Sequence, residues 1–511
     1  MLPLTRRNLI KLLSLAALAK SAPAGFSVGA STAGSRKAPR PFDFESLKDL
    51  AALTAKQAYV PQSPLPPTLA KLNYDAYRLI AFEHVEALWK KEQLPFWTEF
   101  HHRGFVHRDQ VDMHVVRDGR TSELPFDPKY FQYRGKLSGL KPSSDWGFSG
   151  LRFLCRLPER EHYQEFCTFQ GASYFRAIPS HEVYGSSARG IAIDVGLPEP
   201  EEFPKFTQLW MDEPGPDSTT MRMWALLDGP SVAGAYQFII TPGLTQTTLD
   251  IQAELHFRRE VKKLGLGPIT SMWMWDATGK PKKDHRPEVH DADGLLVSAD
   301  SGEWLWRPLR NPNSVSVARY QFGGVRGFGL LQRERELSAY EDREAHYHLR
   351  PGVWISSKRP WTGGAVELLE IPSDTEANDN IAAYWCPAKS PQAGESLALD
   401  YRVAFGRQEP AEHIGGRVVK TSVVPRDGRT VEFTIRWQAG PKMPWPADKS
   451  IEPVVSTNVG ILRDVQAVAV AADVRTVRFL LARDEAKPAE LRCFLRSGSD
   501  ALSETWSYLC S

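Results

Sequence analysis

The alternation of hydrophobic and polar positions predicts short strands over most of this chain. From about residue 96 onward, segments rich in aromatic and β-branched residues are separated by turn residues, which is the pattern of strands joined by hairpins. The pair Asp118-Gly119 favours a two-residue hairpin turn. Strands do not alternate regularly with helices, so we expect antiparallel sheets. The predicted strand segments include VVRDGRTSEL (115–124), SYFRAI (173–178), GIAID (190–194), AYQFII (235–240), TTLDIQAEL (247–255) and AVELLEI (365–371).

Two segments near the N-terminus have helical periodicity. FESLKDLAALTAKQA (44–58) places its apolar residues at helical spacing. YDAYRLIAFEHVEALWKK, from Tyr74, is a second helical candidate. We therefore expect two short helices ahead of a fold dominated by strands.

A break in the pattern predicts two β domains. CPAKSPQAGESL (386–397) contains two Pro, one Gly and polar residues, as linkers between domains do. We predict a domain over residues 40–386 that is a large antiparallel β-sandwich from residue 96, and a smaller immunoglobulin-like β-sandwich over residues 398–511. A hairpin at Asp427-Gly428 is expected in the smaller domain.

The N-terminus has the pattern of an export signal. TRRNLIKLLSLAALA contains the pair Arg6-Arg7 ahead of a short apolar run, which is typical of twin-arginine signals for the export of folded bacterial proteins. Lys20 and Pro23 interrupt the run, so it is too short to span a bilayer in the mature protein. We predict that residues 1–34 are the signal peptide and its lead-in. The mature protein is then expected in the periplasm, without stable membrane insertion.

Composition limits the partners. Lys and Arg number 63 against 61 Asp and Glu, so the net charge of +2 gives no argument for nucleic acid binding, which needs concentrated basic surface. The 15 Trp, 15 Tyr and 24 Phe suit clefts that stack flat ligand faces, although large β-sandwiches also use aromatic residues as core. Five cysteines are too few for a disulfide scaffold. Cys155 with Cys167, or Cys493 with Cys510, could pair in an oxidising compartment.

Several motif-like stretches lack the features of a complete site. GGVRGFG (323–329) has neither the spacing nor the βαβ context of a phosphate-binding loop. EVHDADG (288–294) resembles half of a calcium loop without the remaining ligands. His346 and His348 share a predicted strand face, but no third metal ligand is evident. We therefore predict no metal and no cofactor, and carboxylate chemistry is left as the candidate.

Two aspartates have surroundings that suit acid–base chemistry. A glycosidase uses one protonated carboxyl group to donate to the leaving oxygen and a second group to help activate the nucleophile. Apolar surroundings favour the protonated form of a carboxyl group. Asp379 directly precedes the apolar segment IAAYW, whereas Asp374 and Glu376 lie farther into a polar turn. Asp291, near a group of tryptophans, is the second candidate.

Six blocks, in one order over almost the whole mature chain, carry a family resemblance. The blocks are GASYFRAI (171–178), VYGSSARGIAID (183–194), RPEVHDADGL (286–295), GEWLWRPLRNP (302–312), GLLQRERELSAYEDREAHYHLRP (329–351) and GAVELLEIPSDTEANDNIAAYW (364–385). Together they resemble the glucan biosynthesis protein G/D family of osmoregulated periplasmic glucan synthesis. The twin-arginine signal is similar to that of the D branch.

The resemblance implies a galactose-mutarotase-like β-sandwich joined to an immunoglobulin-like domain, and anomer-inverting action on β-1,2-glucan. The acid of the family's NDN-type segment falls on Asp379. The acid of its VHD segment falls on Asp291, as a remote base or a substrate-orienting group. Tyr347 and Arg350 match positions that line the same cleft. We add Trp304 and Trp306 as substrate-binding residues, because aromatic rings suit the stacking of flat ligand faces.

Three functional outcomes are left open. Attack by water would cleave a β-1,2 bond and release an α-configured end. Attack by a sugar hydroxyl would form an α-linkage, such as an α-1,6 bond that closes a glucan ring. The alternative is a non-catalytic protein that binds and passes on β-1,2-glucan. The sequence is also compatible with a homodimer.

Overall fold

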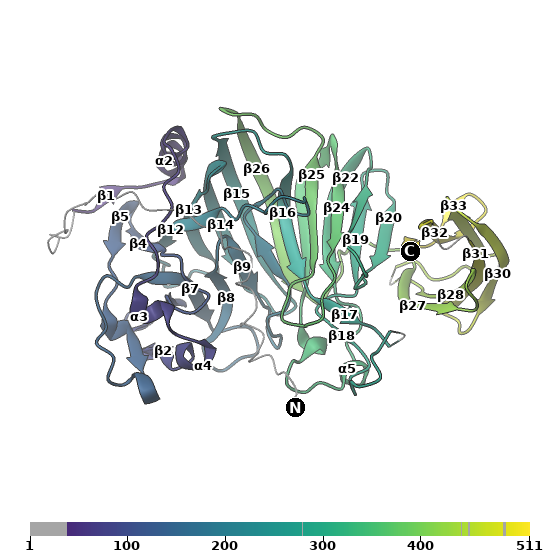
Figure 1. The fold of residues 1–511 in the computed structure, drawn as a ribbon, viewed down its shortest axis with the longest axis horizontal. Helices are drawn as coiled ribbons and strands as arrows, with labels where there is room; N and C mark the ends of the chain where they lie inside the picture. The colour runs from purple at the N-terminus through teal and green to yellow at the C-terminus, as the bar shows by residue number, and fades with distance from the viewer. Residues whose placement is uncertain (1–37, 278, 441, 448–449, 484–486, 511) are drawn as a thin grey trace. The chain divides into compact units, whose positions relative to one another are not determined.

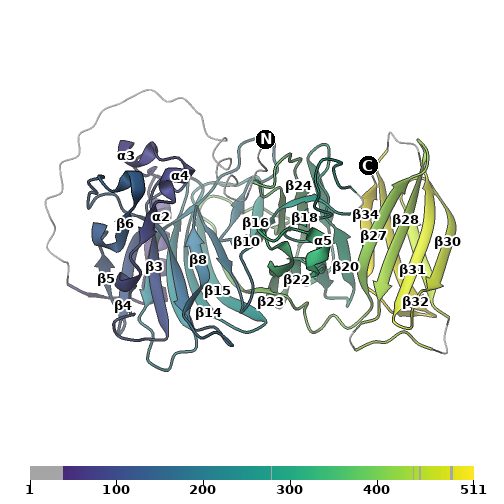
Figure 2. The ribbon, with the colours of Figure 1, turned by 90° about the horizontal axis from the view of Figure 1, so that it is seen from below.

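Strands are the dominant secondary structure of the described chain, with only a few short helices (Figures 1 and 2), which confirms the all-β class. The computed structural model describes residues 38–510 except 278, 441, 448–449 and 484–486. The predicted signal peptide and lead-in, residues 1–34, lie outside the described residues. Among the described helices, none combines the length and the apolar character needed to cross a membrane.

Contacts divide the chain into two compact units. The first contains the described residues up to Pro268, together with Thr375–Asn378 and Lys389–Phe405. The second contains Ile269–Asp374, Asp379–Ala388 and the residues from Gly406 onward. All six residues that the sequence assigned to a site fall in the second unit.

Most strands of the first unit lie in two large sheets, and β2 (Ile80–Phe82) and β6 (Phe131–Tyr133) form a separate two-stranded sheet. One has the strand order β1 (Arg40–Pro41), β5 (Arg120–Leu124), β4 (Asp112–Arg117), β12 (Lys205–Asp212), β13 (Met221–Asp228), β14 (Val232–Thr241), β15 (Gln246–Phe257) and β26 (Ser396–Gly406). The other has the order β3 (Phe96–His102), β7 (Phe148–Cys155), β8 (Gln164–Gln170), β9 (Tyr174–Ala177), β10 (Ser187–Arg189) and β16 (Leu264–Ser271), of which β16 ends in the second unit.

The strand predictions for this unit are confirmed. The hairpin β4–β5 turns at Asp118 and Gly119, whose φ angles of 50° and 67° are the two positive values that a type I′ turn requires. The other predicted segments here contain β9, β11 (Ala192–Ile193), β14 and β15. Burial alternates along β15, so its apolar residues face one side of the sheet.

The first predicted helix is confirmed as α2 (Phe44–Lys56). Asp43 caps its N-terminus by accepting a hydrogen bond from the Ser46 backbone N–H at 2.8 Å. Leu47 and Ala51, four residues apart, lie on the same face of the helix and are buried. They pack against a cluster of side chains from the first sheet: Val116, Trp210, Trp224, Leu226 and Ala235.

The second predicted helix is mostly wrong. The helix α4 ends at Tyr77 after one turn (Tyr74–Tyr77), and β2 (Ile80–Phe82) follows it. β2 pairs with β6 (Phe131–Tyr133), and the ring of Phe82 meets that of Phe131 edge to face at 5.6 Å. Strand pairing and aromatic packing therefore outweigh the local helical periodicity of this segment.

The second unit also contains extended sheets. One has the strand order β23 (Gly352–Thr362), β22 (Gly324–Leu331), β19 (Gly294–Ala299), β20 (Trp304–Pro308), β34 (Thr505–Cys510), β32 (Ala489–Ser497) and β29 (Glu452–Thr457). A second contains β21 (Ser316–Tyr320), β24 (Gly364–Glu370) and β25 (Ile381–Pro387). A third contains β27 (Arg417–Pro425), β28 (Thr430–Gln438), β31 (Val474–Ala482) and β30 (Ile461–Ala469).

The strands predicted for residues 398–511 contribute to more than one of these sheets. β26 lies beside β15, whereas β34 runs parallel to β20 with Trp506 opposite Trp306. Side chains of β28 and β31, including Phe433 and Phe479, pack with Trp506 into one buried cluster. An independent immunoglobulin-like domain with the predicted bounds therefore stays a prediction.

All five cysteines are described, and each is a buried free thiol. In neither of the two possible pairs do the cysteines lie directly opposite each other in the strand register. Cys167 lies opposite Phe153, and Cys155 lies opposite Gln164. Cys493 lies opposite Trp506, whereas Cys510 lies opposite Ala489. A disulfide needs Cβ atoms about 4 Å apart.

Candidate functional site

Asp291 is held at the end of a short strand pair in the second unit. β17 (Trp273–Trp275) pairs with β18 (Val289–His290), and Trp273 lies opposite His290. Directly after β18, the backbone N–H of Asp291 donates to the Met272 carbonyl oxygen at 2.8 Å. The Asp291 side chain is buried, which removes it from bulk water.

The carboxylate of Asp291 forms a buried ion pair with Arg350. Its Oδ1 accepts a hydrogen bond from Arg350 Nη1. The same guanidinium donates through Nη2 to the Ala345 carbonyl oxygen at 3.0 Å, and it lies 4.2 Å from the centre of the Tyr347 ring. The structure therefore brings together three residues that the sequence assigned to the site. A guanidinium this close favours the ionised form of a carboxyl group.

Asp379 is anchored to the same segment of chain as Asp291. It lies near the end of the connection between β24 and β25, and its Oδ2 accepts a hydrogen bond from Thr270 Oγ1 at 2.9 Å. The side chain is half-buried. Its hydrogen-bond partner is thus a neutral hydroxyl group, in contrast to the guanidinium beside Asp291.

Asn380 fixes the backbone next to Asp379. Its Oδ1 accepts from the Trp273 backbone N–H at 2.9 Å, and its Nδ2 donates to the Trp273 carbonyl oxygen at 2.9 Å. Nδ2 also donates to the Ile371 carbonyl oxygen at 3.1 Å. The buried amide of Asn380 therefore joins three segments around the candidate acid.

These contacts anchor both candidate acids to one short stretch of chain, residues 270–273. Asp379 contacts Thr270, and Asp291 contacts Met272 through its backbone. Two residues of extended chain span about 7 Å. Inverting glycosidases hold their two carboxyl groups about 6.5–9.5 Å apart, with room for a water molecule between them. Anchoring on a shared stretch is compatible with that arrangement.

A buried polar group adjoins the site. His290 Nδ1 lies 3.0 Å from Gln332 Oε1, and His290 Nε2 lies 3.1 Å from Glu288 Oε2 and 3.7 Å from Asp293 Oδ1. Burial acts to lower the pKa of His290, but Asp293, Glu288 and Gln332 together raise it above its ordinary value. A doubly protonated imidazole satisfies both neighbouring carboxylates.

Glu288, His290 and Asp293 also form the group of side chains in the described chain that could hold a metal ion. Their potential ligand atoms lie within 4.8 Å of one another. These residues belong to the EVHDADG stretch, where the sequence predicted no metal. The hydrogen bonds of His290 account for its environment without an ion, so the absence of a metal stays a prediction. His346 and His348 lie not on a strand but at the 3₁₀ helix η4 (Tyr347–Leu349), with ring centres 6.0 Å apart.

The structure does not bring Trp304 and Trp306 to these residues. Trp306 is buried in the cluster formed with β28 and β31, where the Arg333 guanidinium lies 3.5 Å from its ring centre. Trp304 stacks on His413 at 4.6 Å. The ring of Trp306 therefore packs against a guanidinium and that of Trp304 against an imidazole.

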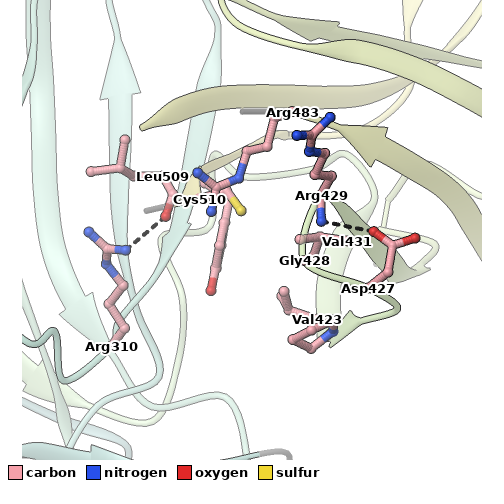
Figure 3. A pocket seen from close by; sticks show the side chains of 11 residues that line it. Arg310, Val423, Asp427, Gly428, Arg429, Val431, Arg483, Leu509 and Cys510 are labelled. Atoms are coloured by element: carbon pink, nitrogen blue, oxygen red, sulfur yellow. Dashed lines mark hydrogen bonds between the residues drawn. The ribbon is translucent and has the colours of Figure 1, made fainter. Parts of the chain in front are cut away.

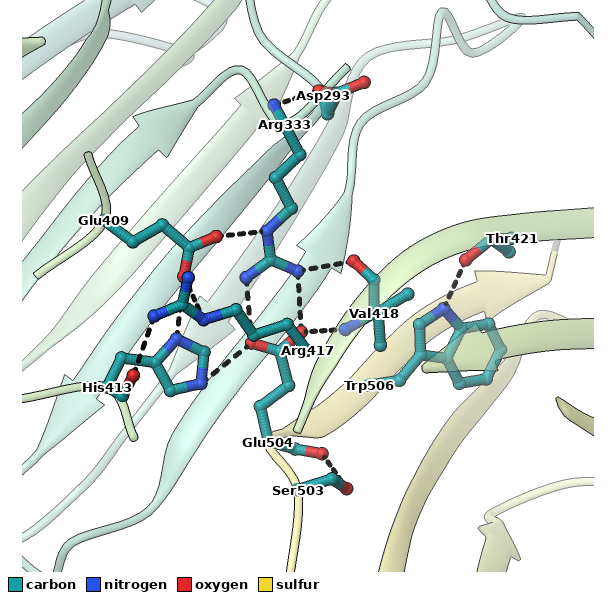
Figure 4. Close-up of polar contacts among 10 residues, drawn as sticks. All are labelled: Asp293, Arg333, Glu409, His413, Arg417, Val418, Thr421, Ser503, Glu504 and Trp506. Carbon is teal, nitrogen blue, oxygen red and sulfur yellow. Dashed lines mark hydrogen bonds and ion pairs between the residues drawn. The ribbon is translucent and has the colours of Figure 1, made fainter. Parts of the chain in front are cut away.

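Arg333 is the centre of that charged cluster (Figure 4). Its guanidinium donates to Glu409 at 2.6 Å, to both carboxylate oxygens of Glu504 at 2.7 and 2.9 Å, and to the Val418 carbonyl oxygen at 2.7 Å. His413 Nδ1 lies 2.8 Å from Glu409. Burial would raise the pKa of Glu409, but Arg333, His413 and Arg417 hold it well below its ordinary value. The cluster is an ion network with nearly all of its charge buried.

A separate cavity of about 230 Å³ contains none of the candidate acids (Figure 3). It lies at the tip of the β27–β28 hairpin, beside the end of β34. Three arginines and one aspartate contribute to its wall. The lining residues are Arg310, Val423, Pro425, Asp427, Gly428, Arg429, Val431, Arg483, Tyr508, Leu509 and Cys510.

The sequence did not predict three residues of the site: Asn380, Thr270 and Gln332. Asn380 stands next to Asp379 in the same block, so the clustered polar residues before IAAYW were a signal for it. Thr270 and Gln332 had none, because each acts on a partner far away along the chain. Long-range side-chain contacts leave no local pattern in a sequence.

A family model and the similar curated proteins point to the same family. The model of a family described as "Periplasmic glucan biosynthesis protein, MdoG" matches residues 42–510. Glucans biosynthesis protein D 1 of Ralstonia nicotianae is 39% identical and covers 98% of both chains. Glucans biosynthesis protein G of a Shewanella species is 38% identical over 91% of this chain and 86% of that protein.

Similarity to solved structures is much weaker. The GH36 α-galactosidase AgaA of Geobacillus stearothermophilus aligns with 50% of this chain and 39% of its own at 10% identity, with a TM-score of 0.26. A galactose mutarotase related enzyme from Lactobacillus acidophilus aligns with 46% of this chain and 96% of its own at 7% identity, with a TM-score of 0.21. Scores this low carry no argument about fold or function.

Proposed function

We propose, from the premise that this chain belongs to the periplasmic glucan biosynthesis protein (MdoG) family, that it is an anomer-inverting enzyme acting on β-1,2-glucan in the periplasm. Membership confirms the family that the sequence blocks indicated. The main support for catalysis is the anchoring of Asp379 and Asp291 on residues 270–273, one beside a hydroxyl group and the other beside a guanidinium.

Asp379 is the proposed proton donor. As the bond between the anomeric carbon and the glycosidic oxygen breaks, the carboxyl group of Asp379 transfers its proton to the departing oxygen. Thr270 donates a hydrogen bond to Oδ2, which leaves Oδ1 to face the substrate. Asn380 holds the backbone at this position, so the carboxyl group does not have to be ordered when the substrate binds.

Asp291 is the proposed base. Arg350 keeps it ionised, and it takes a proton from the attacking oxygen through a relay of water molecules or sugar hydroxyl groups. The attacking oxygen bonds to the anomeric carbon on the face opposite the leaving group, which inverts a β-linkage to an α-configuration. Tyr347 packs under the Arg350 guanidinium and so fixes the orientation of the ion pair.

The nucleophile decides between two products. Water gives endo-hydrolysis and a shorter chain with an α-configured end. The 6-hydroxyl group of the same chain gives a ring closed by an α-1,6 bond. Hydrolysis and ring closure would both use Asp379 as the acid and Asp291 as the base. The alternative, a protein that binds and transfers β-1,2-glucan without breaking bonds, is supported by the family's role in glucan biosynthesis alone.

Chain-length analysis of linear β-1,2-glucan incubated with the purified mature protein separates these functions. We expect either shorter chains or rings that resist exo-acting enzymes. Chains of unchanged length, together with measurable glucan binding, would contradict catalysis and favour the carrier.

Twin-arginine-dependent export is tested separately, by replacing Arg6 and Arg7 with Lys and measuring the protein in the periplasmic fraction.

We expect Asp291→Asn to lower kcat by about 10²- to 10⁴-fold, because the relay loses its terminal base. Asn cannot balance the buried charge of Arg350, so part of the effect is expected as lower stability. Thermal unfolding and glucan binding must therefore be measured beside kcat.

Asp300→Asn is the matched control for this change, since Asp300 is exposed at the end of β19 in the same unit. It should retain activity within about twofold, as surface substitutions away from a site do. Activity of folded Asp291→Asn equal to that of the control would exclude Asp291 as the base.

A further inference from the structure

The side chain of Gln332 lies at the junction of the two segments that supply Asp291 and Arg350. Gln332 directly follows β22, and it is buried. Its Oε1 lies 3.0 Å from His290 Nδ1, and its Nε2 lies 3.3 Å from both the His290 carbonyl oxygen and the Tyr347 carbonyl oxygen. All of the polar atoms of this amide therefore have partners.

These partners fix the orientation of the amide. A carbonyl oxygen can only accept a hydrogen bond, so the two backbone oxygens must face the NH₂ group of Gln332. Oε1 then faces His290, and His290 must carry a proton on Nδ1. The amide thus holds both the backbone and the ring of His290, the residue directly before Asp291.

Gln332 joins two segments that otherwise approach the site separately. His290 ends β18 and precedes Asp291. Tyr347 begins the short 3₁₀ helix η4 (Tyr347–Leu349), which precedes Arg350. The Asp291–Arg350 ion pair spans these two segments. Because the Gln332 amide binds the backbone of both segments, it sets the distance between the segment that carries Asp291 and the segment that carries Arg350.

We propose that Gln332 is a positioning residue that holds Asp291, Arg350 and Tyr347 in reactive register. This inference rests on the proposed function of Asp291. Gln332 is buried and does not itself touch substrate. Its effect is geometric, and a displacement of about 1 Å in a catalytic group can cost about 10²-fold in rate.

Two substitutions separate this role from simple packing. Gln332→Met keeps the approximate volume and removes all three hydrogen bonds. Gln332→Glu keeps an acceptor for His290 Nδ1, but the ionised form cannot donate to either carbonyl oxygen. We expect Gln332→Met to lower kcat on linear β-1,2-glucan by about 10- to 100-fold with KM within about threefold.

We expect Gln332→Glu to lower kcat as well, because its carboxylate still accepts from His290 Nδ1 but cannot donate to either backbone carbonyl oxygen. Gln438→Met, at an exposed position on β28, is the control and should leave kcat unchanged.

A spectroscopic readout makes the test independent of turnover. With ¹⁵N-labelled histidine, long-range ¹H–¹⁵N spectra report which ring nitrogen is protonated, and a His290→Asn sample assigns the signal. We expect Nδ1 of His290 to be protonated in the wild-type protein, and its resonance to shift in Gln332→Met. Folded Gln332→Met with wild-type kcat, or wild-type His290 without a proton on Nδ1, would overturn the inference. Inactive wild-type protein would instead contradict the proposed function.

Discussion

Asp379→Asn should reduce turnover of β-1,2-glucan by about three orders of magnitude while leaving the fold and glucan binding intact. The amide keeps the size of the carboxyl group and can still accept the hydrogen bond of Thr270 Oγ1, so the local structure is retained. It cannot give up a proton to the departing glycosidic oxygen. A sugar alkoxide would then have to leave unprotonated, which is the step that general acid catalysis avoids.

The same loop contains a control for this experiment. Asp374 lies five positions earlier and is exposed, so Asp374→Asn removes a carboxyl group without touching residues 270–273. We expect it to keep activity within about twofold of wild type. Binding of glucan to the inactive Asp379→Asn protein can be measured by calorimetry. If Asp379→Asn and Asp374→Asn turn over glucan equally fast, Asp379 is not the proton donor.

Arg333→Met should lower the free energy of unfolding by about 3–5 kcal/mol, the usual cost of removing one partner from a buried ion network. Met retains much of the length of the Arg side chain and keeps contact with the Trp306 ring. It leaves Glu504 and Glu409 without the guanidinium that binds both of them. Denaturant unfolding, followed by tryptophan fluorescence, measures the change. Arg326→Met, at an exposed position on β22, should change stability by no more than about 0.5 kcal/mol.

The pH dependence of this effect has a defined sign. The pKa of Glu409 is held below its ordinary value of 4.5 in the folded protein, with Arg333 among the causes. A lowered folded pKa stabilises the protein above the unfolded pKa, and this stability is lost as pH falls toward the folded value. The difference between wild type and Arg333→Met should therefore be largest near neutral pH and should shrink below about pH 4. A difference that grows on acidification would contradict the role of the Arg333–Glu409 pair.

Local sequence patterns predicted the elements whose structure depends on local chemistry. The turn at Asp118-Gly119 needs two positive φ angles, and those residue types tolerate them. The helix α2 begins at a capping residue and buries one face. The segment after Tyr77 was mispredicted because its partner, β6, is about fifty residues away along the chain. Periodicity cannot report a contact with a strand that distant.

In the candidate site too, local sequence indicated some residues but not the long-range contacts that hold them. Asp379 was predicted because an apolar segment follows it directly, and Asp291 because tryptophans lie near it in the sequence; the family blocks then supported both. Neither position indicates that Thr270 and Met272 anchor both residues on one stretch. Trp304 and Trp306 have the residue type expected of a sugar-binding surface, but their rings pack on His413 and Arg333. Residue type alone does not distinguish a ring that binds ligand from one that packs in a core.

The anomeric configuration of the product distinguishes an inverting mechanism from a retaining one. Linear β-1,2-glucan is incubated with the purified protein, and ¹H NMR is recorded from the first minutes, before the anomers of any new reducing end equilibrate. We predict that every newly formed anomeric centre is α, whether it is a free end released by water or an α-1,6 linkage that closes a ring. New ends that first form in the β configuration, or glucan that remains unchanged, would contradict the inverting mechanism.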